Sequence, residues 1–133
     1  MKKTLSALIA FLMAFTFAAP TAQARVYDGL AYQEILNAYS SANAAYHDDP
    51  TPTHYYAAYY AYYAAYFYFL GVYHNNDVYR YYGYLYASYS FTFAYQGQLN
   101  SPNDSSTLAQ DLYNAYVHSY YGYYFAYWAS QEF

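Results

Sequence analysis

The sequence predicts an all-α fold, a small bundle of about four helices. Ala, Gly and Ser recur in four segments at alternating steps of four and three residues, the spacing that aligns side chains along one face of an α-helix. Stretches rich in Asp, Asn, Pro and Ser separate the segments, and these residue types favour turns and helix caps. Ala is the second most common residue, whereas the strand-favouring residues Val, Ile and Thr are scarce.

The first two helices are expected from about Asp28 to Tyr46 and from about Pro52 to Tyr73. The carboxylate of Asp28 suits the positive end of a helix dipole. Thr51 offers an N-cap hydroxyl immediately before a proline at the first helical position. The recurring positions are Ala31, Ile35, Ala38, Ala42 and Ala45 in the first segment and Ala57, Ala61, Ala64, Tyr68 and Gly71 in the second.

The third helix is expected from about Val78 to Gln96, and the fourth from about Thr107 to the end of the chain. Asp77 suits the N-terminus of the third helix, and Gly97 fits a left-handed cap at its C-terminus. Thr107 and Gln110 have the spacing of a capping box. The recurring positions are Gly83, Ala87, Ser90, Ala94 and Gly97 in the third segment and Ala115, Ser119, Gly122, Ala126 and Ala129 in the fourth.

A nine-residue block carries this pattern in three of the segments. It reads YYGYLYASY at Tyr81–Tyr89 and YYGYYFAYW at Tyr120–Trp128, with a looser copy, YYAAYYAYY, at Tyr55–Tyr63. Small side chains let helix axes approach closely, and the aromatic residue before each small one is expected to cover the joint between helices. The predicted helix-packing seam of the block consists of Ala57, Ala61, Gly83, Ala87, Gly122 and Ala126.

An all-β membrane-type barrel or sheet is the alternative fold. Aromatic residues alternate with smaller ones in Tyr82–Tyr86 and Tyr89–Tyr95, and Phe133 is a C-terminal aromatic residue of the kind found in outer-membrane barrels. The chain is short for eight spanning strands with their loops. Because Tyr55–Tyr66 shows no alternation, the helical fold is favoured.

Residues 1–24 have the three parts of a secretory signal peptide. Lys2 and Lys3 precede an apolar stretch from Leu5 to Ala19, and Ala22–Ala24 is a small-x-small cleavage site. Residues 25–133 are therefore expected to form one exported, tyrosine-rich helical domain in the periplasm or extracellular space. The uncharged stretch from Tyr55 to Tyr73 is long enough to span a bilayer, but its many hydroxyl groups make membrane association the less favoured reading.

The charge pattern excludes nucleic acid as a partner. The chain has four Lys and Arg residues against eight Asp and Glu, and neutralising phosphates requires cationic groups. No catalytic motif is evident, and Cys and Lys are absent after Lys3, so we expect neither an enzyme nor a cofactor. The spacing of two histidines and two aspartates matches no specific metal site, so these residues are only weak metal candidates. They are His47, Asp48, Asp49 and His54.

The 27 tyrosines are too many for the core of a small bundle, and a large exposed aromatic surface marks an interaction site. The predicted interaction surface consists of Tyr55, Tyr59, Tyr62, Tyr66, Tyr81, Tyr84, Tyr120, Tyr123, Tyr124 and Tyr127. We therefore expect a structural protein of the cell envelope or extracellular space that associates with itself or with another envelope protein. The alternatives are a non-catalytic binding module for a glycan or a flat aromatic ligand, and a small outer-membrane-associated protein.

Overall fold

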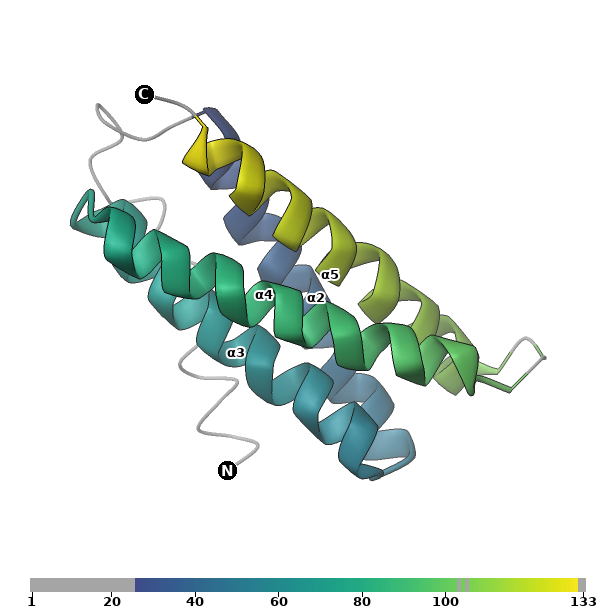
Figure 1. The fold of residues 1–133 in the computed structure, drawn as a ribbon. Helices are drawn as coiled ribbons and strands as arrows, with labels where there is room; N and C mark the ends of the chain where they lie inside the picture. Colours follow the sequence, from purple (N-terminus) through teal and green to yellow (C-terminus); the bar gives the residue numbers. More distant parts are fainter. Residues whose placement is uncertain (1–25, 103, 105, 132–133) are drawn as a thin grey trace.

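The computed structural model describes residues 26–102, 104 and 106–131, which fold as four antiparallel helices (Figure 1). Helix α2 spans Val26–Asp48, α3 Pro52–Tyr73, α4 Asp77–Leu99 and α5 Thr107–Ser130. Helices α2 and α4 each pack against both α3 and α5, so they are diagonal in the bundle. The predicted all-α fold is confirmed. The all-β alternative is wrong, since these residues include no strand. The predicted signal peptide, residues 1–24, lies outside the described residues.

Short polar side chains begin three of the helices. The hydroxyl of Thr51 accepts a hydrogen bond from the amide of His54 at 3.4 Å, with proline at the start of α3 as predicted. The side chain of Asn76 caps α4 by accepting from two backbone amides. At α5 the capping residue is Ser106, whose hydroxyl accepts from the amide of Ala109 at 3.2 Å. The predicted capping box at Thr107 is therefore wrong by one residue.

Gly97 does not end the third helix. Helix α4 continues to Leu99, and Gly97 is buried within it rather than in a left-handed conformation. A β-carbon at this position would lie 3.3 Å from carbons of His54 and Leu112. Gly97 is thus a packing residue, and the predicted C-terminal cap is wrong because sequence alone does not distinguish these two uses of glycine.

Every recurring position of the four segments is buried, so the small residues lie where the helices meet. The two bulky exceptions, Ile35 and Tyr68, lie opposite glycines. A β-carbon on Gly122 would be 2.9 Å from Cγ1 of Ile35, and one on Gly83 would be 2.8 Å from Cδ2 of Tyr68. Each large side chain therefore occupies space that any residue other than glycine in the facing helix would fill.

A buried ion pair joins α2 to α4 at the end of the bundle where both helices begin. The guanidinium of Arg80 donates to the carboxylate of Asp28 through Nε, at 3.3 and 3.2 Å, and through Nη2, at 3.0 Å. The hydroxyl of Tyr68 donates to the same carboxylate at 2.7 Å, and Nη1 of Arg80 donates to Asp77 at 3.2 Å. Asp28 and Arg80 are only 1% and 4% exposed, so their hydrogen bonds replace lost hydration.

Aromatic rings cover the α3–α4 joint, as expected from their places beside the small residues. Tyr60 stacks on Tyr86 and Phe93, with ring centroids 5.9 and 5.8 Å apart. Phe67 stacks on Tyr86 at 5.5 Å. A second set covers the α4–α5 joint, where Phe91 stacks on rings of α5.

Within the described helices, no stretch is both long and apolar enough to cross a membrane.

Candidate functional site

The predicted interaction tyrosines divide into two groups in the structure. The exposed group consists of Tyr59, Tyr66, Tyr81, Tyr120, Tyr124 and Tyr127. The half-buried group consists of Tyr55, Tyr62, Tyr84 and Tyr123. The ten tyrosines are distributed over α3, α4 and α5, and α3 and α5 are diagonal in the bundle.

Several exposed aromatic residues were assigned from the sequence only to covering helix joints. They include Tyr56, Tyr82, Tyr89, Tyr121 and Trp128. Tyr56 shows how both roles combine, since its ring packs against Phe93 of α4 with centroids 5.3 Å apart while 41% of the residue is exposed. A ring at the edge of a seam packs through one part and presents another to solvent. Position beside a seam residue is therefore also a signal for exposure.

One aromatic surface runs along α3 and α4. We call it the α3–α4 tyrosine face and define it by Tyr56, Tyr59, Tyr66, Tyr82 and Tyr89, each 37–42% exposed. Its rings contact neighbouring rings. The ring centroids of Tyr59 and Tyr63 are 4.9 Å apart, and those of Tyr89 and Tyr60 are 5.4 Å apart. The face is therefore a set of positioned rings rather than independent side chains.

Charged residues are absent from the parts of the helices that carry most of the tyrosines. No Asp, Glu, Lys or Arg occurs in residues 52–73, 81–99 or 112–130. The outer side of α2 is different, since it carries exposed Gln33, Ser40 and His47, and Gln33 donates to Asn37. The bundle thus has a polar side on α2 and aromatic sides on the other helices.

Three phenol groups on these sides, those of Tyr62, Tyr63 and Tyr84, have a raised pKa and keep their protons over the physiological range. Burial raises the pKa of Tyr63, and the neighbouring Tyr59 raises it further. Burial is also the main cause of the raised pKa of Tyr62 and Tyr84, and nearby tyrosines raise both pKa values further. Each hydroxyl can then both donate and accept a hydrogen bond, which suits a neutral partner surface.

The weak metal candidates do not assemble into a ligand set. Nδ1 of His54 lies 2.8 Å from the backbone oxygen of Asp49, so this nitrogen donates within the α2–α3 turn. His54 is also buried against Gly97. Among the described residues no group of three His, Asp or Glu side chains could hold a metal ion. Burial raises the pKa of the Asp111 carboxyl, and repulsion by the nearby carboxylate of Asp48 raises this pKa further.

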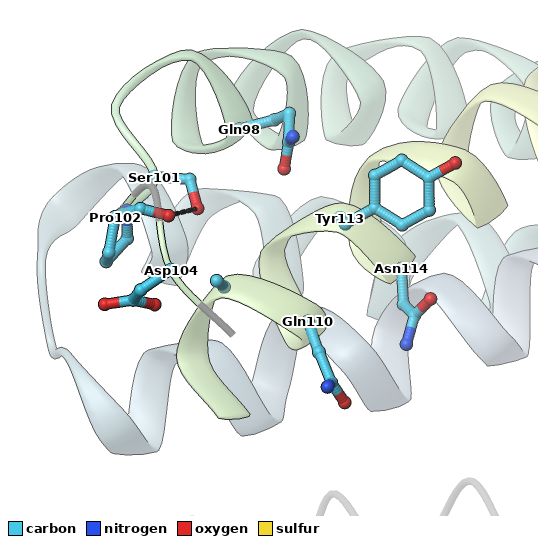
Figure 2. A pocket seen from close by; sticks show the side chains of 8 residues that line it. Gln98, Ser101, Pro102, Asp104, Gln110, Tyr113 and Asn114 are labelled. Atoms are coloured by element: carbon cyan, nitrogen blue, oxygen red, sulfur yellow. Dashed lines mark hydrogen bonds between the residues drawn. The ribbon is translucent and has the colours of Figure 1, made fainter. Parts of the chain in front are cut away.

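A polar pocket of about 430 Å³ lies where α4 leads into α5 (Figure 2). Its lining consists of Gln98, Ser101, Pro102, Asp104, Ala109, Gln110, Tyr113 and Asn114. Figure 2 shows the amide of Gln98 between the ring of Tyr113 and the side chain of Ser101. Oε1 of Gln98 is buried and has no hydrogen-bond partner among the described residues, while Tyr113 is 54% exposed. The sequence did not single out this pocket, because the loop between the helices forms one wall.

Comparisons with known proteins supply no relative. No protein-family model matches the chain, and no curated protein or solved structure matches it. The function is therefore inferred from the chemistry of the two features described above, the tyrosine face and the polar pocket.

Proposed function

We propose that the chain is an exported structural protein of the envelope or extracellular space that associates with itself through the α3–α4 tyrosine face. The observation that carries the proposal is the row of ordered, exposed rings on a side of the bundle without formal charge. Aromatic residues are enriched and charged residues depleted at the centres of protein interfaces. The proposed export rests on the signal peptide that the sequence predicts at residues 1–24.

A second copy of the chain is the partner that this chemistry fits best. A phenol hydroxyl both donates and accepts, so a tyrosine face is complementary to another tyrosine face. A charged partner would find no opposite charge in residues 52–73 or 81–99. The rings already contact one another, as Tyr59 contacts Tyr63, so association orders fewer side chains than it would on a flexible surface.

Self-association predicts a concentration-dependent increase in mass in analytical ultracentrifugation of the exported protein. Replacing Tyr59 and Tyr89 together with Ser should weaken association by about tenfold or more, because interface tyrosines are frequent hot spots. Leu30→Ser is the matched control, since Leu30 is an exposed large side chain on α2, 47% accessible. It should leave association unchanged.

A strictly monomeric protein at millimolar concentration would contradict the proposal. Equal weakening by the tyrosine pair and by Leu30→Ser would show that association does not use the α3–α4 tyrosine face. Far-UV circular dichroism and thermal unfolding of each variant establish that the bundle is intact.

The polar pocket supports a second candidate function, the binding of a neutral glycan. Its amides and hydroxyls can pair with sugar hydroxyls, and the unsatisfied oxygen of Gln98 is an acceptor that a small rearrangement would let a ligand satisfy. The exposed ring of Tyr113 offers a flat apolar surface for a sugar ring. This combination of an apolar platform and a few polar groups is typical of small-molecule sites.

Glycan binding predicts chemical-shift changes at the pocket when cellotriose or chitotriose is titrated into the protein. Tyr113→Ala should lower the affinity by about tenfold, because stacking on the ring is lost. Tyr124→Ala is the control, since Tyr124 is an exposed tyrosine of α5, 39% accessible, that does not line the pocket. Equal losses in both variants, or no binding of either sugar, would contradict this function.

A further inference from the structure

A second pocket, of about 330 Å³, lies between the beginning of α4 and the end of α5, away from the polar pocket. Its lining consists of Asp77, Arg80, Tyr81, Tyr84, Ala126, Tyr127 and Ser130. Three of these residues are tyrosines, and none of the three belongs to the α3–α4 tyrosine face. The pocket is therefore independent of the surface proposed for self-association.

The three tyrosines contribute differently oriented rings to one small volume. The ring centroid of Tyr84 lies 6.4 Å from that of Tyr81, with 38° between the ring planes. It lies 6.5 Å from that of Tyr127, with 44° between the planes. These separations are comparable with the reach of about 6 Å over which an aromatic ring attracts a cation. A single cation can thus interact with more than one ring.

The charged groups at this pocket favour a cation over an anion. Arg80 is the only Lys or Arg in the described part of the chain. Its Nε, Nη1 and Nη2 atoms donate to the carboxylates of Asp28 and Asp77. The Arg80 side chain is 5% exposed, whereas the Asp77 side chain is 66% exposed. A carboxylate rather than a guanidinium therefore dominates the accessible rim.

The tyrosines also select the kind of cation. The walls are mainly aromatic and apolar, apart from the charged rim and Ser130, so they do not replace the water shell of a metal ion or a primary ammonium. An alkylated ammonium ion is weakly hydrated, and its methyl groups can pack on ring faces. Burial and the adjacent tyrosines raise the pKa of Tyr84, so its ring stays neutral and its hydroxyl keeps its proton.

We propose that this pocket binds a small alkylated ammonium ion, of the trimethylammonium type found in choline, between the rings of Tyr81, Tyr84 and Tyr127. Recognition of quaternary ammonium groups by several aromatic rings is an established use of cation–π attraction. Asp77 adds a negative charge at the rim while it also accepts from Arg80.

The test compares choline with 3,3-dimethyl-1-butanol, which has the same shape but no charge. Both are titrated into the full exported protein and followed by nuclear magnetic resonance. We expect choline to bind at least about tenfold more tightly. Equal affinities would overturn the proposal, because they would show an apolar pocket that ignores charge. Failure of choline to bind would overturn it as well.

Variants then test whether choline binds between the rings of these three tyrosines. Tyr127→Leu should lower choline affinity by about tenfold, whereas Tyr127→Phe should retain most of it because the ring persists. Tyr120→Leu is the matched control, since Tyr120 and Tyr127 are both on α5 and are 40% and 45% exposed. A loss in Tyr120→Leu equal to that in Tyr127→Leu would contradict the assignment, and so would equal losses in the Leu and Phe variants of Tyr127. Thermal unfolding verifies that each variant is folded.

A trimethylammonium group can come from a free metabolite or from a lipid headgroup. Co-sedimentation with phosphatidylcholine vesicles, compared with phosphatidylglycerol vesicles, distinguishes these sources. Binding of free choline with no vesicle binding assigns a small soluble ligand, and binding of both choline and phosphatidylcholine assigns a lipid headgroup as well. Vesicle binding without any affinity for free choline would overturn the proposal.

Discussion

Gly83→Ala is expected to destabilise the protein, whereas Gly29→Ala, the same change in another helix, is expected to stabilise it. A β-carbon on Gly83 would lie 2.9 Å from the backbone nitrogen of Tyr68 and 2.9 Å from its Cβ, so α3 and α4 would have to move apart. Overpacking of this kind costs about 1–3 kcal/mol. A β-carbon on Gly29 meets no atom within 4 Å, so that variant keeps the helix-propensity gain of up to about 1 kcal/mol.

Thermal unfolding followed by circular dichroism measures both changes. For a domain of this size, 1 kcal/mol corresponds to roughly 4–8 °C in the unfolding midpoint, so the two variants should move the midpoint in opposite directions. A second pair tests the same idea in α5: Gly122→Leu should destabilise far more than Tyr124→Leu, because Gly122 faces Ile35 and Tyr124 is exposed. Midpoints that move together within either pair would contradict close packing at the glycines.

The sequence predicted the helices and their buried faces because both depend on local spacing. The steps from Ala57 to Ala61 and from Gly83 to Ala87 place those residues on one helix face whatever the rest of the chain does. The pairing of Tyr68 with Gly83 was not predicted, since it depends on how α3 and α4 align. In hindsight the signal was present: the two large residues in the seams, Ile35 and Tyr68, each meet a glycine.

The site could be predicted only in part. Tyrosine enrichment indicated an exposed aromatic surface, but which rings are exposed depends on how far each helix rotates and what it meets. Tyr84, assigned from the sequence to the exposed surface, is half-buried by α5, while Tyr82, assigned only to covering a helix joint, is 42% exposed. The polar pocket was not predicted, because it depends on how the loop between α4 and α5 folds. The second pocket was not predicted, because it joins residues from the beginning of α4 with residues from the end of α5 that are distant in sequence.

The ion pair between Asp28 and Arg80 was missed for the same reason. The two residues are 52 positions apart, and in sequence each resembles an ordinary surface charge near a helix start. What distinguishes Arg80 in hindsight is its place beside Gly71, whose hypothetical β-carbon would lie 2.6 Å from the Arg80 backbone nitrogen. Close approach of α3 and α4 at that point leaves Arg80 buried, so its charge needs a partner.

Loss of either member of this ion pair is expected to cost more than any surface change in the protein. Asp28→Leu leaves the guanidinium of Arg80, which is 4% exposed, with Asp77 as its remaining partner in the described residues. It also removes the acceptor of the Tyr68 hydroxyl at 2.7 Å. Breaking one half of a buried pair costs about 3–5 kcal/mol. Arg80→Met should cost a similar amount, because the carboxylate of Asp28 then stays buried without the guanidinium.

The double variant, Asp28→Leu with Arg80→Met, decides whether the effect belongs to the pair. Because it leaves no uncompensated charge of the pair, its loss of unfolding free energy should be well below the sum of the single losses. Urea unfolding of the wild type, both single variants and the double variant measures this coupling. Asp48→Leu is the control, since Asp48 is exposed at the end of α2 and should change stability little. Additive single and double losses would show that Asp28 and Arg80 act separately, despite their three hydrogen bonds.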